Sequence, residues 1–543
     1  MAEAAQALAH LISEFWRWRT STQPDSFDDI PRVRRPNGWI ADWSAESVAD
    51  RRAQLTQFTA RHQALNITDQ PIEVQVDARL FGVGLARVRW ELDLLRSWQR
   101  NPCFYIDQSL VPIYIELLAP PPFDDERAAA IVRHLERVPI ILDQARQNLT
   151  GHAAAPFAMY AQRLLADGPE NLQRAMTALG PLLPAQFASR LPELSRAAAG
   201  HVADYRDWLS EQTFSGQSAV GKDVLTFFLH QVALLPYTVD EMLDHARREY
   251  QRAAAAEAVW ETRASRSSTG DPSPSYIVQQ HVQEEQLRRF YADAGLLDLP
   301  ETVRHYRFAL MPPYLDPLTW LGVPHYISSL QYPDEEAVRY VRALGPDLPY
   351  FEQSKALDPR TGIVHEGVHA HQLALSWMHT NPARRHFYDS LPNEGIAFYN
   401  EELMLMSGLF DTTPASGAFL ANGMRLRALR VRTDLGLATG DLSIDQAADL
   451  LAETVPLDRT TAWQEAAFFA SNPGQGLSYQ IGKMQILDLL ATASAKQDDF
   501  DLRSFHSRLW REGNVPLVLQ RWELLGLRDQ LDTADRLAQP TSS

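Results

Sequence analysis

The chain has 543 residues, 45% of them hydrophobic, which is enough to bury a large core in about two to four structural units. Its formal net charge is −17, from 68 acidic and 51 basic residues, and this argues against a nucleic-acid partner, because such partners need basic patches. The single cysteine, Cys103, excludes an internal disulfide framework and a cysteine-based zinc site. Between Pro102 and Phe104, it is expected to be a small buried residue.

The first helix is expected at the N-terminus. Residues 1–20 lack the basic start and small-residue cleavage site of a signal peptide. Apolar residues recur there at helical spacing, which predicts an amphipathic helix docked on the protein body: Leu8, Leu11, Ile12, Phe15 and Trp16. No run of about 18 apolar residues occurs, so we expect no transmembrane span, no membrane partner and a cytoplasmic location.

Helical periodicity dominates the rest of the chain, most clearly over residues 46–65, 125–149 and 239–260. Residues 305–330 are aromatic and broken by prolines, which indicates short strands and loops. The Ser-, Pro- and Gly-rich stretch 263–276 predicts a loop. We therefore predict a mainly α fold with a few short β-strands near the active site. An N-terminal helical half, 1–275, and a catalytic half, 276–543, would form one interleaved unit around a cleft.

The segment GIVHEGVHAHQLAL, residues 362–375, crowds histidines around a glutamate. Asp358 and Pro359 are a plausible helix start, and a helix over 361–378 would put His365 and His369 one turn apart on one face. At that spacing two imidazoles reach one zinc ion. Glu366, next to the first histidine, is then placed to act as general base on a water activated by the metal.

A third ligand is expected from a second helix over residues 391–410, which Asn393 could cap, with Glu394 in its first turn. Two histidines, one glutamate and an open position form a catalytic rather than a structural zinc site. Glu401 lies two turns beyond Glu394 on the same face and could hydrogen-bond a ligating histidine. For Glu401 and Glu402, a solvated acidic face is favoured over a direct metal role.

Five segments resemble, in the same order, the blocks of the bacterial domain-of-unknown-function family 885: VHEGVHAHQ, NEGIAFYNEEL, and residues 427–451, 472–486 and 501–517. The resemblance extends into the N-terminal half at NPCFYI and around Gly221 and Lys222. That family is grouped with the gluzincin-like zinc metallopeptidases. The resemblance therefore implies a large helical, gluzincin-like architecture with an HExxH-plus-Glu zinc site.

The chain departs from the family pattern at two positions. Family members usually read His-Glu-x-x-Pro-Gly-His-His, so their second histidine aligns with His371 and a proline aligns with His369. On an unbroken helix six residues turn about 600°, so His365 and His371 point apart unless the helix is bulged. We favour His369 as the ligand, with His371 as its rival. The family also places a histidine at the position of Ala438. If that histidine assists catalysis elsewhere in the family, this chain has lost or relocated its function.

Four further residues are candidates for the site. Tyr479 is the tyrosine that the gluzincin-like resemblance implies as an oxyanion donor, and a buried tyrosine bonded to backbone is the alternative. Arg427 and Arg430 fit either carboxylate or oxyanion binding or a salt-bridged surface helix. His506, among apolar neighbours, is expected to be a packing residue.

These residues predict a metal-dependent hydrolase, with one zinc ion per chain, that cleaves an amide or peptide bond in short peptides or small molecules. His365, His369 and Glu394 would hold the metal, and Glu366 and Tyr479 would be catalytic. Manganese or iron would suit the same ligands. Two alternatives are a zinc-dependent hydrolase of a non-peptide amide or ester, and a non-catalytic binding protein on a peptidase scaffold. The intact Glu366 weighs against the second.

Overall fold

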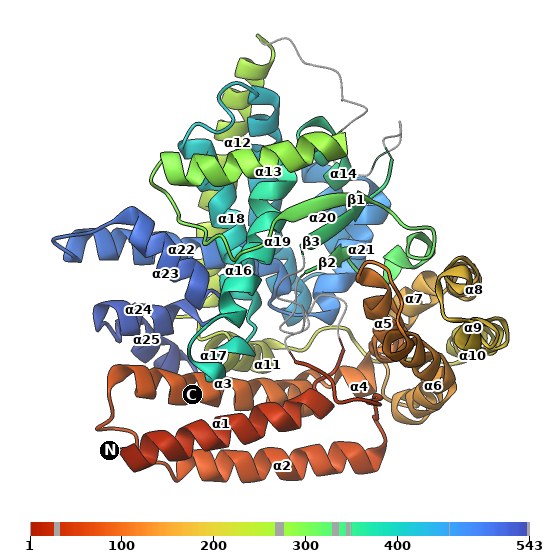
Figure 1. Ribbon diagram of the computed structural model, residues 1–543. Coiled ribbons are helices and arrows are strands. Elements are labelled where there is room, and N and C mark those ends of the chain that lie inside the picture. Colours follow the sequence, from red (N-terminus) through yellow and green to blue (C-terminus); the bar gives the residue numbers. More distant parts are fainter. Residues whose placement is uncertain are drawn as a thin grey trace.

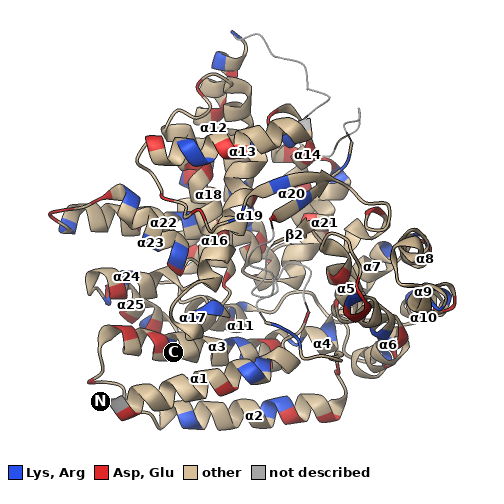
Figure 2. Cartoon of the chain, viewed as in Figure 1, with Lys and Arg blue, Asp and Glu red and all other residues tan. Residues whose placement is uncertain are grey.

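The protein is mainly helical, as predicted, with many helices packed around one small sheet (Figure 1). The computed structural model describes residues 2–25, 33–266, 276–327, 336–343, 348, 350–455 and 457–539. No helix within these ranges is long and apolar enough to cross a membrane. Acidic and basic residues are interspersed along the helices in the view of Figure 2.

The first part of the chain forms α1 (Ala2–Thr22), α2 (Ala45–Gln63), α3 (Ile72–Arg89), η1 (Trp90–Leu95), α4 (Ser97–Arg100), α5 (Pro102–Leu118), α6 (Asp125–Leu149), α7 (Ala155–Leu164), α8 (Gly168–Leu179), η2 (Gly180–Leu182), α9 (Ala185–Ala188), α10 (Leu191–Glu211), α11 (Lys222–Phe227), η3 (Phe228–Val232) and α12 (Val239–Ala264). The second part forms α13 (Tyr276–Asp293), β1 (Tyr306–Leu310), η4 (Asp316–Leu321), β2 (His325–Tyr326), β3 (Ala337–Val341), α14 (Tyr350–Leu357), α15 (Arg360–Gly362), η5 (Ile363–Gly367), α16 (Val368–Trp377), α17 (Pro382–Arg385), α18 (Ser390–Met406), α19 (Pro414–Thr439), α20 (Ile444–Thr454), α21 (Arg459–Ser471), α22 (Gln475–Lys496), α23 (Leu502–Glu512), α24 (Leu517–Leu525) and α25 (Asp529–Leu537).

Several helix ends follow from side-chain capping. Ser44 accepts a hydrogen bond from the Ser47 N–H at the start of α2, and Asp124 accepts one from Arg127 at the start of α6. Thr238 and Glu241 form a capping box at the start of α12. The predicted helices over 46–65, 125–149 and 239–260 are therefore confirmed as α2, α6 and α12.

The N-terminal helix and Cys103 also lie as predicted. In α1 the side chains of Leu8, Leu11, Ile12 and Phe15 are buried against the body of the protein. Cys103 is buried in α5, and burial raises the pKa of its thiol well above the usual range, which leaves it unreactive.

The sheet has the strand order β1-β3-β2, with β1 parallel and β2 antiparallel to β3. The Gln280 side chain of α13 covers the outer edge of β1, since it donates to the Tyr306 carbonyl and accepts from the Phe308 N–H. Strands β1 and β2 fall within the predicted range 305–330, with η4 between them, and residues 328–330 lie outside the described part. The third strand, β3, was not predicted.

Helices from both sides of residue 275 share one core. The long α12 lies along α19, and α18 packs against α22. One buried cluster joins Trp90 and Leu225 to Val431 and Ile481. The predicted loop 263–276 is helical at its first two residues, and residues 267–275 lie outside the described part.

Candidate metal centre

The first two candidate ligands lie on a helical run made of α15, η5 and α16. The run begins at Arg360, whose N–H donates a hydrogen bond to the side chain of Asp358 two residues earlier. The run is α-helical except over η5, which is a π-helical turn containing His365 and Glu366. Such turns inside α-helices occur frequently at functional sites. The predicted helix over 361–378 is thus present, with a bulge at the first histidine.

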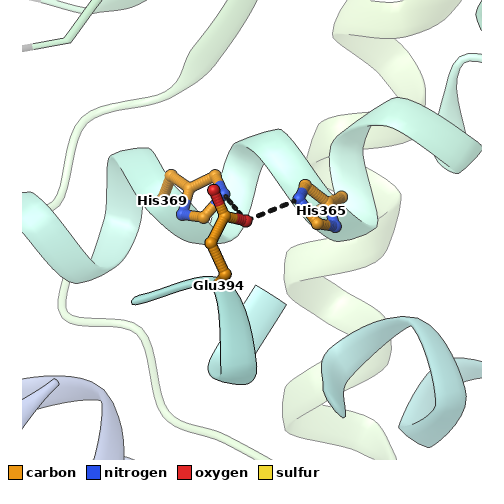
Figure 3. Close-up of side chains that lie close together, drawn as sticks. All are labelled: His365, His369 and Glu394. Carbon is orange, nitrogen blue, oxygen red and sulfur yellow. Dashed lines mark ion pairs between the residues drawn. The ribbon is translucent and has the colours of Figure 1, made fainter. Parts of the chain in front are cut away.

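His365, His369 and Glu394 converge on one point (Figure 3). The centres of the two imidazole rings are 5.0 Å apart, and the Nε2 atom of each ring lies 3.3 Å from Oε2 of Glu394. The ligand atoms of the three residues lie within 4.8 Å of one another. Structure and sequence therefore agree on which three side chains are close together.

These three residues fit a zinc ion by an observation independent of their spacing. Oε2 of Glu394 is buried and makes no aligned hydrogen bond, although two histidine nitrogens are near it. A buried carboxylate oxygen without a hydrogen bond is costly and calls for another partner. Two imidazole nitrogens and one carboxylate oxygen are the donor set of a three-ligand zinc site with an open position.

Electrostatics hold the cluster together without a metal. Burial opposes a charge on His365, but the hydrogen bond to Glu401 and the nearby Glu394 carboxylate raise its pKa to about 9. Burial likewise opposes the charge on Glu394, yet His369 and His365 lower the pKa of that carboxyl well below its usual range. A metal ion would take the place of the proton on Nε2 of His365, so binding of the metal would release that proton.

Glu401 lies directly behind His365. Its Oε1 is 2.6 Å from Nδ1 of His365 and 3.4 Å from a guanidinium nitrogen of Arg427. Glu402 points elsewhere, to Lys483 at 2.7 Å and Arg252 at 2.7 Å. The prediction of a solvated acidic face is wrong for both, because basic side chains distant in the sequence neutralise them inside the core.

The helix that carries Glu394 begins earlier than expected. Asp389, not Asn393, is the cap of α18, since its side chain accepts from the Leu391 N–H. Glu394 is consequently in the second turn rather than the first. Sequence reasoning missed this cap because Pro392 lies between Asp389 and Asn393. A proline can occupy the first turn of a helix, however, and Pro392 does so here.

The cluster forms part of the wall of a cavity of about 1170 Å³. Helices α5 and α6 and residues 33–39 contribute to the same wall, together with the β2 strand. Glu366 also lines this cavity, and its two oxygens lie 3.8 Å from His325 and 4.0 Å from Lys355. Burial opposes its ionisation, but Arg339, Lys355 and the nearby histidines together lower the pKa of the Glu366 carboxyl.

His371, the rival ligand, is buried away from the three converging residues. Its Nε2 lies 3.4 Å from Glu284 and 3.2 Å from Arg288, both on α13. The guanidinium of Arg288 occupies the position beside that nitrogen where a cation would have to bind, so this geometry is unfavourable for a shared metal.

Tyr479 and Arg430 lie next to the cluster. Tyr479 on α22 lines the cavity. Its ring is stacked on that of His365, with the ring centres 6.1 Å apart. Arg430 lies 4.9 Å from the centre of the same ring and is paired with Glu465. Both Arg427 and Arg430 are buried, so the alternative of a salt-bridged surface helix is wrong.

The remaining candidates are structural. His506 is fully buried, with Nδ1 bonded to the Leu296 carbonyl and Nε2 to the Tyr399 hydroxyl, as expected of a packing residue. Ala438 is buried in α19, and its carbonyl accepts from the N–H groups of Val220 and Gly221. Asp434 caps α22 through the Gly474 and Leu477 N–H groups.

Sequence reasoning missed His325. It lies on the two-residue strand β2, lines the cavity and is the histidine beside Glu366. A lone histidine in an aromatic, proline-rich segment gives no periodic signal, and only the pairing of β2 with β3 brings it to the site.

The fold and the cluster together define a large, mainly helical protein with two histidines and a glutamate in the wall of a cavity. The chain belongs to the bacterial family of proteins of unknown function DUF885, whose sequence model matches residues 31–523. No curated protein matches it.

Two solved structures share the fold. One is a candidate lipoprotein of unknown function from Shewanella oneidensis, with a TM-score of 0.69 and 16% identity over 96% of this chain and 99% of that one. The other is a candidate lipoprotein from Colwellia psychrerythraea, with a TM-score of 0.71 and 15% identity over 98% of this chain and 99% of that one. At these identities the likeness concerns the fold alone.

Proposed function

We propose that the protein is a metal-dependent hydrolase, with zinc as the metal, that cleaves an amide or peptide bond in short peptides or small molecules. The observation that carries the proposal is the convergence of His365, His369 and the unbonded Glu394 oxygen in a cavity wall that also contains Glu366. A relationship to gluzincin-like peptidases belongs to the same proposal. The cytoplasmic location expected from the N-terminal residues stays a prediction.

Each residue has a distinct task in this proposal. Zinc in a site of this kind supplies Lewis acidity, which activates water and polarises a carbonyl group. Glu366 accepts a proton from the attacking water and passes it to the leaving amine. Tyr479, in the cavity wall next to His365, hydrogen-bonds the developing oxyanion. The cavity volume suits a short peptide or a small molecule rather than a folded protein.

Metal analysis of the purified protein tests the site. We expect about one zinc ion per chain, zinc affinity lowered at least about 100-fold in His369→Ala, and unchanged binding in His371→Ala. Loss of zinc from the His371 variant alone would show that the ligand assignment is wrong.

Glu366→Gln separates catalysis from binding. We expect this variant to keep its zinc and to lose turnover by about 10²- to 10⁴-fold on whichever short peptide or amide metabolite the wild type hydrolyses. Equal turnover in the variant and the wild type would contradict the hydrolase mechanism. Full zinc occupancy without turnover of peptides, amides or esters by the wild type would favour a binding protein.

A further inference from the structure

Four arginines in the described part of the chain line the cavity: Arg34, Arg35, Arg127 and Arg133. Two of them are engaged by the protein itself, since Arg35 pairs with Asp25 and the guanidinium of Arg127 donates to backbone carbonyl groups of residues 116–122. Arg34 is exposed, so water can hydrate its charge. The fourth, Arg133, is half-buried, and the mechanism above gives it no task.

Arg133 lies on the face of α6 that borders the cavity. Ala130, Arg133 and His134 follow one another at helical spacing, and all three line the cavity. The charge of Arg133 also acts on two cavity-lining side chains. Burial, and next the charge of Arg133, lowers the pKa of His134 to about 4. Burial raises the pKa of the Glu116 carboxyl on α5, against the charges of Arg127 and Arg133. The guanidinium is therefore on the cavity side of α6.

The guanidinium of Arg133 forms no hydrogen bond or ion pair with any described residue, Glu116 included. Its Nε is buried, whereas the two terminal nitrogens keep accessible surface. A guanidinium is charged at every pH that a protein tolerates, and a half-buried charge without a counter-ion is unfavourable. The two terminal nitrogens are therefore free to bind an anion that enters the cavity.

We propose that Arg133 binds a carboxylate of the substrate through its two terminal nitrogens, so that the cavity selects acids over their neutral analogues. Two parallel N–H···O bonds to a carboxylate match the guanidinium fork. The same cavity of about 1170 Å³ borders α6 and the cluster of His365, His369 and Glu394, so one short peptide can occupy both ends. The carboxylate is that of the chain terminus or of an acidic side chain. This inference rests on the proposed function and narrows its substrate class.

Three peptides test the inference and distinguish the two sources of the carboxylate. Trialanine has a free C-terminal carboxylate, trialanine amide has none, and the amide of Ala-Glu-Ala has one on its side chain only. Their dissociation constants are measured by calorimetric titration of zinc-loaded protein that carries Glu366→Gln, so that no peptide is hydrolysed. We expect one of the two acids to bind about 10- to 100-fold more tightly than trialanine amide, the effect of two charge-assisted hydrogen bonds.

Four variants in this background assign the preference to Arg133. Arg133→Gln should abolish it. Arg133→Lys keeps the charge without the fork and should retain part of it, and this variant serves alone if Arg133→Gln does not fold, as judged by circular dichroism. Arg137→Gln makes the same exchange one turn further along α6, outside the cavity wall, and should keep the full preference. Glu116→Gln removes a negative charge near Arg133 and should raise the preference a few-fold, which a purely structural Arg133 would not explain.

The outcomes separate this inference from the proposed function. Acids that bind no more tightly than trialanine amide, or a preference that stays unchanged in both Arg133→Gln and Arg133→Lys, would overturn the role of Arg133 while leaving the zinc site intact. A protein that binds no zinc but keeps a preference dependent on Arg133 would instead refute the proposed function, and the acid would then be a bound ligand rather than a substrate.

Discussion

The carboxylate behind His365 decides which of the two ring nitrogens is left for a metal. Oε1 of Glu401 lies 2.6 Å from Nδ1 of His365, so a proton is held on Nδ1 and Nε2 is the nitrogen that gives up its proton to bind a metal. Arg427, 3.4 Å from the same oxygen, helps to lower the pKa of the Glu401 carboxyl against the opposing effect of burial.

Glu401→Gln should therefore weaken zinc binding about 10- to 100-fold, because the neutral amide orients and polarises His365 less strongly. Zinc affinity measured by competition with a chelator checks this. Glu402→Gln is the matched control: its carboxylate pairs with Lys483 and Arg252, so zinc affinity should stay unchanged while the melting temperature falls. Equal zinc affinity in the wild type and Glu401→Gln would mean that Glu401 only fills space.

At the residue scale, sequence reasoning recovers what local spacing encodes. His365 and His369 follow from helical periodicity, and Glu394 from its place in the next helix. The burial of Glu401 and Glu402 could not be predicted, because their partners Arg427 and Lys483 come from later helices. His325 reaches the site only through the pairing of β2 with β3, which no local sequence pattern predicts.

At the scale of elements, a glycine contact brings the Glu394 helix close to the Tyr479 helix. Helices α18 and α22 cross at Gly395 and Gly482, and a methyl group at Gly395 would lie 2.7 Å from the Gly482 carbonyl carbon. A methyl group at Gly482 would overlap the Leu391 carbonyl oxygen. Only glycine at both positions allows the backbones to approach so closely.

Gly482→Ala should force the two helices apart, at a cost of about 1–3 kcal/mol of unfolding free energy. Because the shift moves Glu394 relative to His365 and His369, zinc affinity should fall as well. Thermal unfolding and zinc titration measure the two effects. The control is Gly200→Ala in α10, where an added methyl group meets no atom within 4 Å. That variant should gain about 0.5–1 kcal/mol from helix propensity. A Gly482→Ala protein as stable as the wild type would contradict the close crossing.

Helix types and lengths were largely predictable, since α2, α6 and α12 carry long periodic patterns and capping residues. The start of α18 and the strand β3 were not. A helix start depends on which of several polar residues accepts the first free N–H, and a five-residue strand depends on its neighbours in the sheet.

At the scale of the molecule, a buried arginine ties the N-terminal helices to the C-terminal ones. Arg384 of α17 pairs with Asp77 on α3 at 2.9 Å, with Glu512 at the end of α23 at 2.8 Å and with Glu523 on α24 at 2.8 Å. His379 lies 3.0 Å from the same oxygen of Glu512. Segments far apart in the sequence are thus joined on the side of the molecule where α1 and α3 lie (Figure 1).

This junction makes stability depend on acid pH through Glu512. Burial raises the pKa of its carboxyl, but His379 and Arg384 outweigh burial and lower it to about 2, against 4.5 for an ordinary glutamate. The folded protein therefore holds the ionised form more strongly than the unfolded chain does. The resulting stabilisation, on the order of 3 kcal/mol, is fully present above pH 4.5 and is lost as the pH falls towards 2.

Glu512→Gln removes that contribution, so its melting temperature should lie furthest below the wild type at pH 6–7 and approach it as the pH falls below 4.5. Thermal unfolding followed by tryptophan fluorescence across this range measures the difference. Glu136→Gln is the control, because its pairing with Arg190 is exposed and such pairs contribute about 0–1 kcal/mol. A gap between Glu512→Gln and the wild type that stayed constant from pH 7 to pH 3 would show that the Glu512 charge does not hold the junction together.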